Sequence, residues 1–399
     1  MVYILWLFVM ALAGTALAKK MKFPYPIALV LLGTVVGTFS FFNELKLHFM
    51  DEDMFRNIVI DIFLPALIGE AALKLSFKKI KENSHAILAL AIGGTLISYL
   101  TTGLLIAYLL NWPLQVALVL GALMAATDPV SIVSIFKSLG VNKDLEITME
   151  GESLANDGVA IVLFKLTVFS YTLISSSGWM GIGIGIGEFL KVSLGGIFVG
   201  CACGFIASRV VSHFDDYPLE NSFSIALFYG TYFLSESLHV SGVISIVAAG
   251  LVLGNYGRSI GMSEKTQQSI EVFWDTIAFI GNSLIFYLVG LEIQQISIQE
   301  YWVYIIIAIA VSILSRSIAV YLSTVGTKLP LSWKHILNWG GLKGSLSIAL
   351  AMSLPSNFPQ REAIVCLIFG VVFFSLIGQG LTIGTLIKRM PNIDIQKVK

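Results

Sequence analysis

Charged side chains are scarce in this sequence of 399 residues. Asp, Glu, Lys and Arg together make up only 13% of the chain, about half of the roughly 25% that is usual in a soluble domain. Hydrophobic residues make up 56%, and the mean hydropathy is +0.85. A soluble core does not require so much apolar surface, whereas a bilayer does, so we expect a polytopic membrane protein. The formal net charge is zero, which gives no electrostatic reason to expect a nucleic-acid partner.

Cysteine is also scarce. The three cysteines, Cys201, Cys203 and Cys366, lie inside apolar runs, without a Cys-x-x-Cys pair and without a histidine cluster nearby. Metal sites and redox motifs need such spacings, whereas a free cysteine commonly behaves as a small buried hydrophobe. We therefore expect no resident metal centre and no redox cofactor.

The first apolar run ends in Ala-Leu-Ala, like a signal-peptide cleavage site. A secretory signal carries its positive charges before the apolar run, whereas here Lys19, Lys20 and Lys22 follow it. This order predicts a first transmembrane helix whose N-terminus lies outside.

Thirteen apolar runs are long enough for transmembrane helices, each of which needs about 20 mostly apolar residues. The segments between them are short and leave no room for a separate soluble domain. The predicted fold class is an all-α polytopic membrane protein with about thirteen transmembrane helices. These spans lie near 2–18, 24–41, 56–73, 85–110, 113–137, 147–173, 188–211, 222–238, 240–257, 270–291, 301–325, 333–353 and 362–387.

Lysine and arginine in the loops orient these spans, because short loops rich in them stay in the cytoplasm. With the N-terminus outside, the outer loops receive little beyond Lys46, Arg56 and Arg361. Most other loop lysines and arginines then fall on the inner side. This asymmetry predicts a cytoplasmic C-terminus.

Two predicted spans contain residues that interrupt helices. The fifth contains Thr127-Asp128-Pro129, and the twelfth contains the glycine-rich stretch 339–345. Proline removes a backbone donor and glycine weakens a helix, so both spans are expected to unwind near the membrane centre. They are seven spans apart and therefore run in opposite directions, as in two inverted six-helix repeats joined by a linking helix. Paired interrupted helices mark transporter binding sites.

Four polar side chains share one face of the sixth span. Glu152, Ser153, Asn156 and Asp157 fall within roughly 140° at about 100° per residue. A charge at the bilayer centre costs at least about 2.5–3.5 kcal/mol, so this face must point into the protein. Asp157 and Ser153 are four residues apart and can meet one ion, and hard cations prefer oxygen ligands. The alternative is that Asp157 caps a neighbouring helix.

Two further carboxylates have more than one open role. Asp128 either contacts the ion, directly or through water, or neutralises the positive N-terminal end of a half-helix. Glu70 lies near the inner end of the third span, just before Lys74. It is either an ion ligand, a residue of the inner entrance or an interfacial charge. Asp61 lies about 180° around the same helix and cannot serve the same site.

Two basic residues lie deep inside predicted spans. Arg316, in the eleventh span, needs a carboxylate partner, and we expect that partner to be Glu152. This pairing would leave Asp157 without a fixed counter-charge. Lys343, in the interrupted twelfth span, is expected to balance the negative C-terminal helix end where that span breaks.

These stretches resemble the cation/proton antiporter family, whose prokaryotic members are the NhaP proteins and which includes the eukaryotic sodium/hydrogen exchangers. The resemblance rests on 126–130 (Ala-Thr-Asp-Pro-Val), 152–158 (Glu-Ser-Leu-Ala-Asn-Asp-Gly), Arg316 and 339–344 (Trp-Gly-Gly-Leu-Lys-Gly). It covers nearly the whole chain in order. It implies crossed broken helices, a homodimer and location in a prokaryotic cell membrane.

The resemblance also implies two units. Helices 1–3, within 1–84, and helices 7–10, within 176–295, would supply the dimerisation domain and the linking helix 7. Helices 4–6, within 85–175, and helices 11–13, within 296–390, would form a mobile core domain. Residues 391–399 would be a short cytoplasmic tail.

Roles for individual residues follow from the same resemblance. Asp157 would alternately hold a cation or a proton. Ser153, Glu70 and the backbone carbonyl of Thr127 would be further sodium ligands, with Asp128 nearby.

The supporting residues also match the family pattern, with one departure. Glu152 and Arg316 correspond to a buried ion pair. Asn156 stands where electrogenic relatives have a second Asp, which implies exchange of one cation for one proton. Lys343 replaces the usual Arg and lacks its planar fork.

The predicted function is exchange of sodium or lithium for protons by alternating access at one site, without a cofactor. Desolvation disfavours a bare buried carboxylate, so the core domain would cross only when it carries a cation or a proton. The alternatives are a potassium/proton antiporter of the same fold, a cation channel, and an intramembrane aspartyl protease using Asp128 and Asp157.

Overall fold

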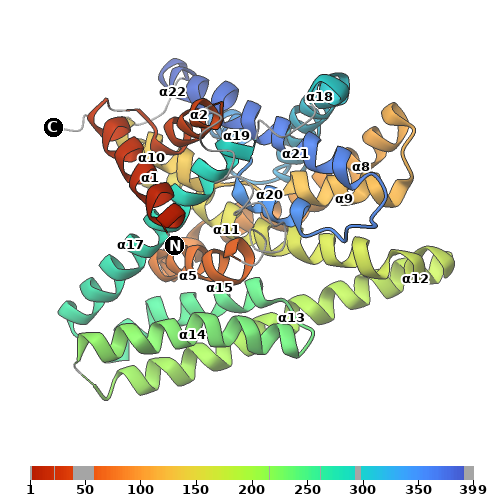
Figure 1. Cartoon of the computed structure of the whole chain (residues 1–399). Helices are drawn as coiled ribbons and strands as arrows, with labels where there is room; N and C mark the ends of the chain where they lie inside the picture. Colours follow the sequence, from red (N-terminus) through yellow and green to blue (C-terminus); the bar gives the residue numbers. More distant parts are fainter. Residues whose placement is uncertain are drawn as a thin grey trace.

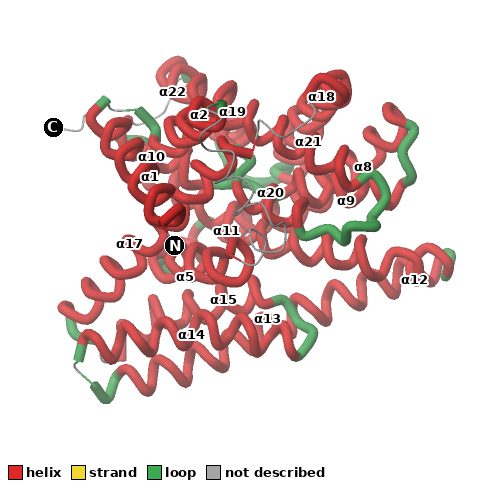
Figure 2. Tube along the Cα trace, viewed as in Figure 1, coloured by secondary structure: helices red, strands yellow, loops and turns green. Residues whose placement is uncertain are grey.

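The computed structural model describes residues 2–21, 23–38, 58–214, 216–260, 262–292 and 298–390. Throughout these residues the chain forms helices joined by turns and loops, and no strand occurs in them (Figure 2). The predictions made for Lys22, Lys46, Arg56 and the tail 391–399 lie outside the described residues. The all-α fold class predicted from the apolar runs is confirmed.

The described part of each predicted span corresponds to one helix or to consecutive helical segments, some of them joined by π-helical turns. The α-helices are α1 (Val2–Lys20), α2 (Tyr25–Gly37), α5 (Leu64–Lys74), α6 (Phe77–Glu82), α7 (Ser84–Leu88), α8 (Thr95–Leu110), α9 (Leu114–Ala125), α10 (Pro129–Leu139), α11 (Lys143–Lys165), α12 (Tyr171–Ser176), α13 (Trp179–Val211), α14 (Tyr217–Ser237), α15 (Gly242–Val252), α16 (Arg258–Ile260), α17 (Glu264–Glu292), α18 (Ile298–Ser323), α19 (Leu331–Gly340), α20 (Ser345–Met352), α21 (Arg361–Phe374) and α22 (Gly380–Arg389). The π-helical turns are η2 (Ile58–Phe63), η3 (Ala89–Gly94), η4 (Leu166–Ser170), η5 (Leu253–Gly257) and η6 (Ser375–Gln379).

Seven described helical stretches are long and apolar enough to cross a membrane. Two further apolar helices, α2 and α9, are shorter, and the total of about thirteen spans stays a prediction. The six-residue helix α6 was not predicted, because its lysine-rich sequence has no apolar run. The seven stretches are Ser84–Leu110, Lys143–Ser176, Met180–Val211, Gly242–Ile260, Glu264–Leu291, Glu300–Ser323 and Arg361–Arg389.

Local capping residues fix where the central helix α11 begins. The preceding helix α10 ends at Leu139 and is followed by Gly140, whose φ of 65° is a left-handed conformation that glycine adopts without strain. Asn142 then caps α11, because its side-chain oxygen accepts a hydrogen bond from the Asp144 N–H at 2.8 Å. The acidic side chains of Asp144 and Glu146 lie in the first turn, where they complement the positive helix end.

The two interrupted spans meet where their helices are unwound. The first breaks between α9 and α10, and the second breaks between α19 and α20, so the predicted interruptions are confirmed. The Asp128 N–H donates to the Leu342 carbonyl at 2.7 Å across the two breaks. A Cβ atom on Gly344 would lie 2.3 Å from the Asp128 Cβ, which is far inside van der Waals contact. Glycine at 344 is therefore required for this close crossing.

The helices pack in two groups with α11 between them. One group contains α2, α5, α13, α14, α15 and α17, which pack on one another, and the other contains α8, α9, α18, α20 and α21. In Figure 1, α13, α14 and α15 lie in the lower part of the molecule, and α8, α9, α18 and α21 lie above and to the right. Helix α11 contacts members of both groups, including α5, α9 and α15.

Candidate functional site

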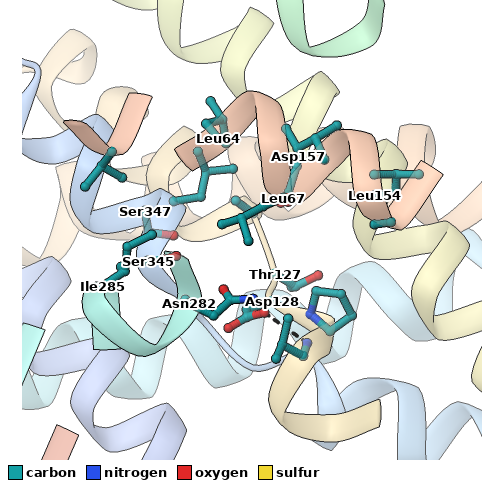
Figure 3. A pocket seen from close by; sticks show the side chains of 18 of the residues that line it. Leu64, Leu67, Thr127, Asp128, Leu154, Asp157, Asn282, Ile285, Ser345 and Ser347 are labelled. Carbon is teal, nitrogen blue, oxygen red and sulfur yellow. Dashed lines mark hydrogen bonds between the residues drawn. The ribbon is translucent and has the colours of Figure 1, made fainter. Parts of the chain in front are cut away.

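A cavity lies where α5, α11 and α17 meet the two interrupted spans. Its volume is about 100 Å³, which is enough for several water molecules. Most of its lining is apolar, including Leu64, Leu67 and Leu154, which Figure 3 shows around the polar residues. The polar and charged side chains of the lining are Glu70, Thr127, Asp128, Asp157, Asn282, Ser345 and Ser347.

Asp157 reaches this cavity from the middle of α11. Its Oδ1 atom is buried and has no hydrogen-bond partner in the described part of the chain. No Lys or Arg among those residues forms an ion pair with it. A buried carboxylate oxygen without a partner carries a large desolvation penalty when it is ionised. Asp157 therefore has a strong physical reason to take up a proton or a cation.

Asp128 lies in the first interruption and uses its two carboxylate oxygens differently. Its Oδ1 atom accepts a hydrogen bond from the Val130 N–H at 3.0 Å and so caps α10. Its Oδ2 atom is buried and has no partner among the residues described. Of the two roles left open by the sequence, the capping contact is present in the structure. The second oxygen remains free for the cavity.

Ser153 and Asn156 lie behind Thr127 and do not line the cavity. The Ser153 hydroxyl donates to the Thr127 carbonyl oxygen at 2.5 Å and lies 3.0 Å from the Thr127 hydroxyl. The Asn156 side-chain amide donates to the Thr127 hydroxyl at 2.8 Å. These bonds hold the unwound segment against α11. In this conformation Ser153 positions the Thr127 carbonyl, and its oxygen would have to move to the cavity to meet an ion there.

The structure brings Arg316 and Glu152 together in a buried two-point contact. Arg316 Nη1 lies 2.7 Å from Glu152 Oε1, and Nη2 lies 3.1 Å from Oε2. Glu152 is fully buried and Arg316 is 6% exposed. Glu152 Oε1 also accepts a hydrogen bond from the Asn156 amide at 3.0 Å. Arg316 thus pairs with Glu152, and Asp157 forms no ion pair with a described residue.

Lys343 stabilises a different helix end from the predicted one. Its Nζ atom lies 3.3 Å from the Ala126 carbonyl oxygen, at the C-terminal end of α9 in the first interruption. The prediction placed it at the break of its own span, where α19 ends. There the Leu337 carbonyl accepts from Arg316 at 2.9 Å, and Gln379 donates to the Trp339 carbonyl at 3.4 Å. Lys343 thus joins the two interrupted spans, because it belongs to the second span and its side chain reaches a backbone carbonyl of the first.

Glu70 lines the cavity from α5 and forms an ion pair with Lys74, one helical turn later. Lys74 also contacts Asp275 on α17. The Glu70 side chain is 18% exposed, whereas those of Lys74 and Asp275 are 38% and 50% exposed. This network therefore runs from the cavity toward the surface, and Glu70 occupies its inner end.

Asn282 lines the cavity but was not predicted from the sequence. It comes from α17, is 7% exposed, and lies beside Asp128 in Figure 3. The available signal was an amide side chain at the centre of the apolar run 270–291. Ser345 and Ser347, from the first turn of α20, were also missed. Ser347 donates to the Leu123 carbonyl at 2.7 Å.

Among the described residues, no three His, Cys, Asp or Glu side chains lie close enough together to hold a metal ion. The crossed interruptions, the small cavity beside them and an Asp157 carboxylate oxygen without a partner among the described residues are typical of a secondary transporter.

The chain belongs to the sodium/hydrogen exchanger family. The family model described as "Sodium/hydrogen exchanger, transmembrane" matches residues 7–389. The chain is 50% identical over 386 residues to the Na(+)/H(+) antiporter NhaG of Bacillus atrophaeus, covering 96% of this chain and 74% of that protein. It is 47% identical over 392 residues to the Na(+)/H(+) antiporter NhaH of Halobacillus aidingensis, covering 98% and 97%. The resemblance found in the motifs is thereby confirmed.

A solved structure has the same fold. The sodium proton antiporter MjNhaP1 of Methanocaldococcus jannaschii superposes with a TM-score of 0.80 at 22% identity, over 98% of each chain. Since this family consists of transporters, the chain is not an enzyme, and the intramembrane protease alternative is set aside.

Proposed function

We propose that this protein exchanges sodium or lithium for protons across a prokaryotic cell membrane, with Asp157 as the exchanging group. The observation that carries the proposal is the buried Asp157 carboxylate, whose Oδ1 atom lacks a partner among the described residues while the neighbouring Glu152 is paired with Arg316. The relatives named Na(+)/H(+) antiporters, at up to 50% identity, support sodium as the cation.

Exchange follows from competition for one site. An ionised Asp157 attracts a cation, and a protonated Asp157 does not. Thr127 would supply its carbonyl oxygen, Glu70 a second carboxylate, and Asp128 a contact through water. Ser153 is the remaining proposed ligand and would join after its hydroxyl turns away from Thr127. A bare carboxylate in the closed site is costly, so only the cation-loaded and proton-loaded forms cross.

Alternating access requires one helix group to move against the other. We assign 85–175 and 296–390 to a mobile core domain, and 1–84 and 176–295 to a dimerisation domain with the linking helix. The cavity lining supports this division, because α5 and α17 belong to the proposed dimerisation domain, whereas α11 and the interrupted spans belong to the proposed core domain. The protein is proposed to act as a homodimer, with its N-terminus outside, its C-terminus cytoplasmic, and a role in pH homeostasis.

The proposed stoichiometry is one cation for one proton. Asp157 has Asn156 as its neighbour on the polar face of α11, and the Asn156 amide is engaged by Thr127 and Glu152. An amide cannot carry a proton in exchange for a cation. With a single exchanging carboxylate, the charge carried in each direction is equal.

Proton flux in proteoliposomes tests the proposal. We expect Asp157→Asn to abolish sodium-driven proton movement, because the amide neither releases a proton nor attracts a cation. Asp144→Asn is the matched control, since Asp144 lies on the same helix but is exposed. Normal exchange by Asp157→Asn, in protein that elutes as the wild type does, would disprove the assignment.

A further inference from the structure

A second, larger cavity lies on the other side of α11. We call it the lateral groove, and it is bounded by α6, α7, α11, α13 and α15. Its volume is about 820 Å³, within the range of about 300–1,000 Å³ that is usual for ligand sites. Its lining is almost entirely apolar and includes Phe77, Leu154, Phe189, Leu194, Val247 and Leu251. Leu154 also lines the ion cavity, so the two spaces adjoin at this side chain.

The lateral groove opens toward the lipid-facing surface of the protein. Helix α13, which forms one wall, contains a candidate membrane span of which only 17% is buried. Groove residues on both walls are largely exposed, with Leu194 at 59%, Ile197 at 45% and Leu88 at 54%. Such an apolar space offers water almost no hydrogen-bond partners. In a bilayer it is suited to a hydrocarbon chain.

The helix at one end of the lateral groove, α6, is rich in basic residues. Phe77 and Ile80 of α6 line the groove, and the same short helix carries Lys78, Lys79 and Lys81. All three lysines lie outside the ion pairs found among the described residues. A polar headgroup at this end would therefore meet unpaired positive charge.

Arg209, on α13, adds a further positive charge to the same end. Its guanidinium lies 5.9 Å from the ring centre of Tyr256, and Tyr256 lines the groove beside Asn255. Asn255 accepts a hydrogen bond from the Phe77 N–H at 2.8 Å, which places the start of α6 next to Tyr256. Arg209 also forms no ion pair with another described residue. Positive charge thus approaches this end from both α6 and α13.

We propose that the lateral groove binds an anionic phospholipid. One acyl chain lies between α11, α13 and α15, and the phosphate lies at the α6 end beside Arg209 and the α6 lysines. The apolar walls require hydrocarbon, and the unpaired basic residues select a negative headgroup. This inference concerns a separate space and does not depend on the proposed exchange at Asp157.

Photolabelling with synthetic lipids locates the bound molecule. The intact protein would be reconstituted in nanodiscs that contain phosphatidylglycerol with a diazirine in its acyl chain, and parallel samples would contain the same label on phosphatidylcholine. After irradiation and digestion, we expect the phosphatidylglycerol label on the groove segments 189–201 and 244–252. Equal labelling of these segments by both lipids would overturn the headgroup part of the proposal, and labelling confined to other segments would overturn the site.

Variants with matched controls test the two halves of the site separately. Arg209→Gln should weaken phosphatidylglycerol retention about fivefold in native mass spectrometry, whereas Lys191→Gln on the same helix, outside the groove, should not. Ser193→Phe would fill the groove from α13 and displace the acyl chain, whereas Ser222→Phe on an exposed part of α14 should not. All variants must elute as the wild type does. Retention that is unchanged in Arg209→Gln and Ser193→Phe, or lost equally in their controls, would overturn the proposal.

Discussion

Replacing Arg316 by leucine should destabilise the protein more than any surface substitution. The guanidinium makes two contacts with Glu152, at 2.7 Å and 3.1 Å, and a third with the Leu337 carbonyl at 2.9 Å. Leucine removes all three and leaves a fully buried Glu152 carboxylate without its counter-charge. Removal of one partner from a buried ion pair typically costs about 3–5 kcal/mol.

A second substitution separates the lost pair from lost packing. Glu152→Gln removes the uncompensated charge but keeps an oxygen that can accept from the Asn156 amide. Arg316→Leu combined with Glu152→Gln should therefore be more stable than Arg316→Leu alone, by about 2 kcal/mol. The gain arises because part of the cost lies in the unpaired buried charge, which the second substitution removes.

Denaturant titration of the detergent-solubilised protein measures these free energies of unfolding. Arg389→Leu is a suitable control, since Arg389 lies at the exposed end of α22 and should change stability by less than about 0.5 kcal/mol. The reasoning is refuted if Arg316→Leu costs no more than Arg389→Leu. It is also refuted if Glu152→Gln brings no recovery.

Three further predictions concern the crossing, an interface and the charge balance. Gly344→Ala should abolish exchange in proteoliposomes, because the alanine Cβ would lie 2.3 Å from the Asp128 Cβ. The control Gly230→Ala should exchange normally, because its Cβ would meet nothing within 4 Å. Lys165→Glu should lower the free energy of unfolding by about 0.2–1 kcal/mol in denaturant titration, because it breaks the 2.6 Å ion pair that joins α11 to Glu236 of α14. Adding Glu236→Lys should recover the ion-pair part of this loss but not the hydrogen bond that Glu236 accepts from the Gly242 N–H. Losses that simply add would contradict this. A membrane potential set with potassium and valinomycin should not change exchange, because one cation for one proton moves no net charge. Transfer of one net charge per cycle would instead shift the sodium distribution about 50-fold per 100 mV.

Local signals in the sequence were sufficient to predict most of the fold. Apolar runs predict helices such as α8, α13 and α18, because a bilayer demands length and hydrophobicity of each span separately. The breaks at Pro129 and Gly341 are also local, since proline and glycine act on their own helix. Helix α6 was not predicted, because its six residues are too few to show a helical hydrophobic period.

Contacts in the site are made between helices whose relative positions could not be predicted from the sequence. Helical spacing placed Ser153 and Asp157 on one face, but it could not reveal that Thr127 covers Ser153 and leaves Asp157 at the cavity. Lys343 was expected to act on its own span, although its partner Ala126 lies in the other interruption. Asn282 was missed because an amide in an apolar run carries no charge to demand a partner.

Calorimetric titration with sodium chloride, in buffers of different ionisation enthalpy, measures the protons released when sodium binds and tests competition at Asp157 most directly. Near the pH at which half the sites are protonated, the wild type should release protons on binding sodium, and the release should vanish at alkaline pH, where Asp157 is already ionised. Asp157→Asn should show neither sodium binding nor proton release. Sodium binding without proton release at any pH, or an unchanged release by Asp157→Asn, would contradict exchange at this carboxylate.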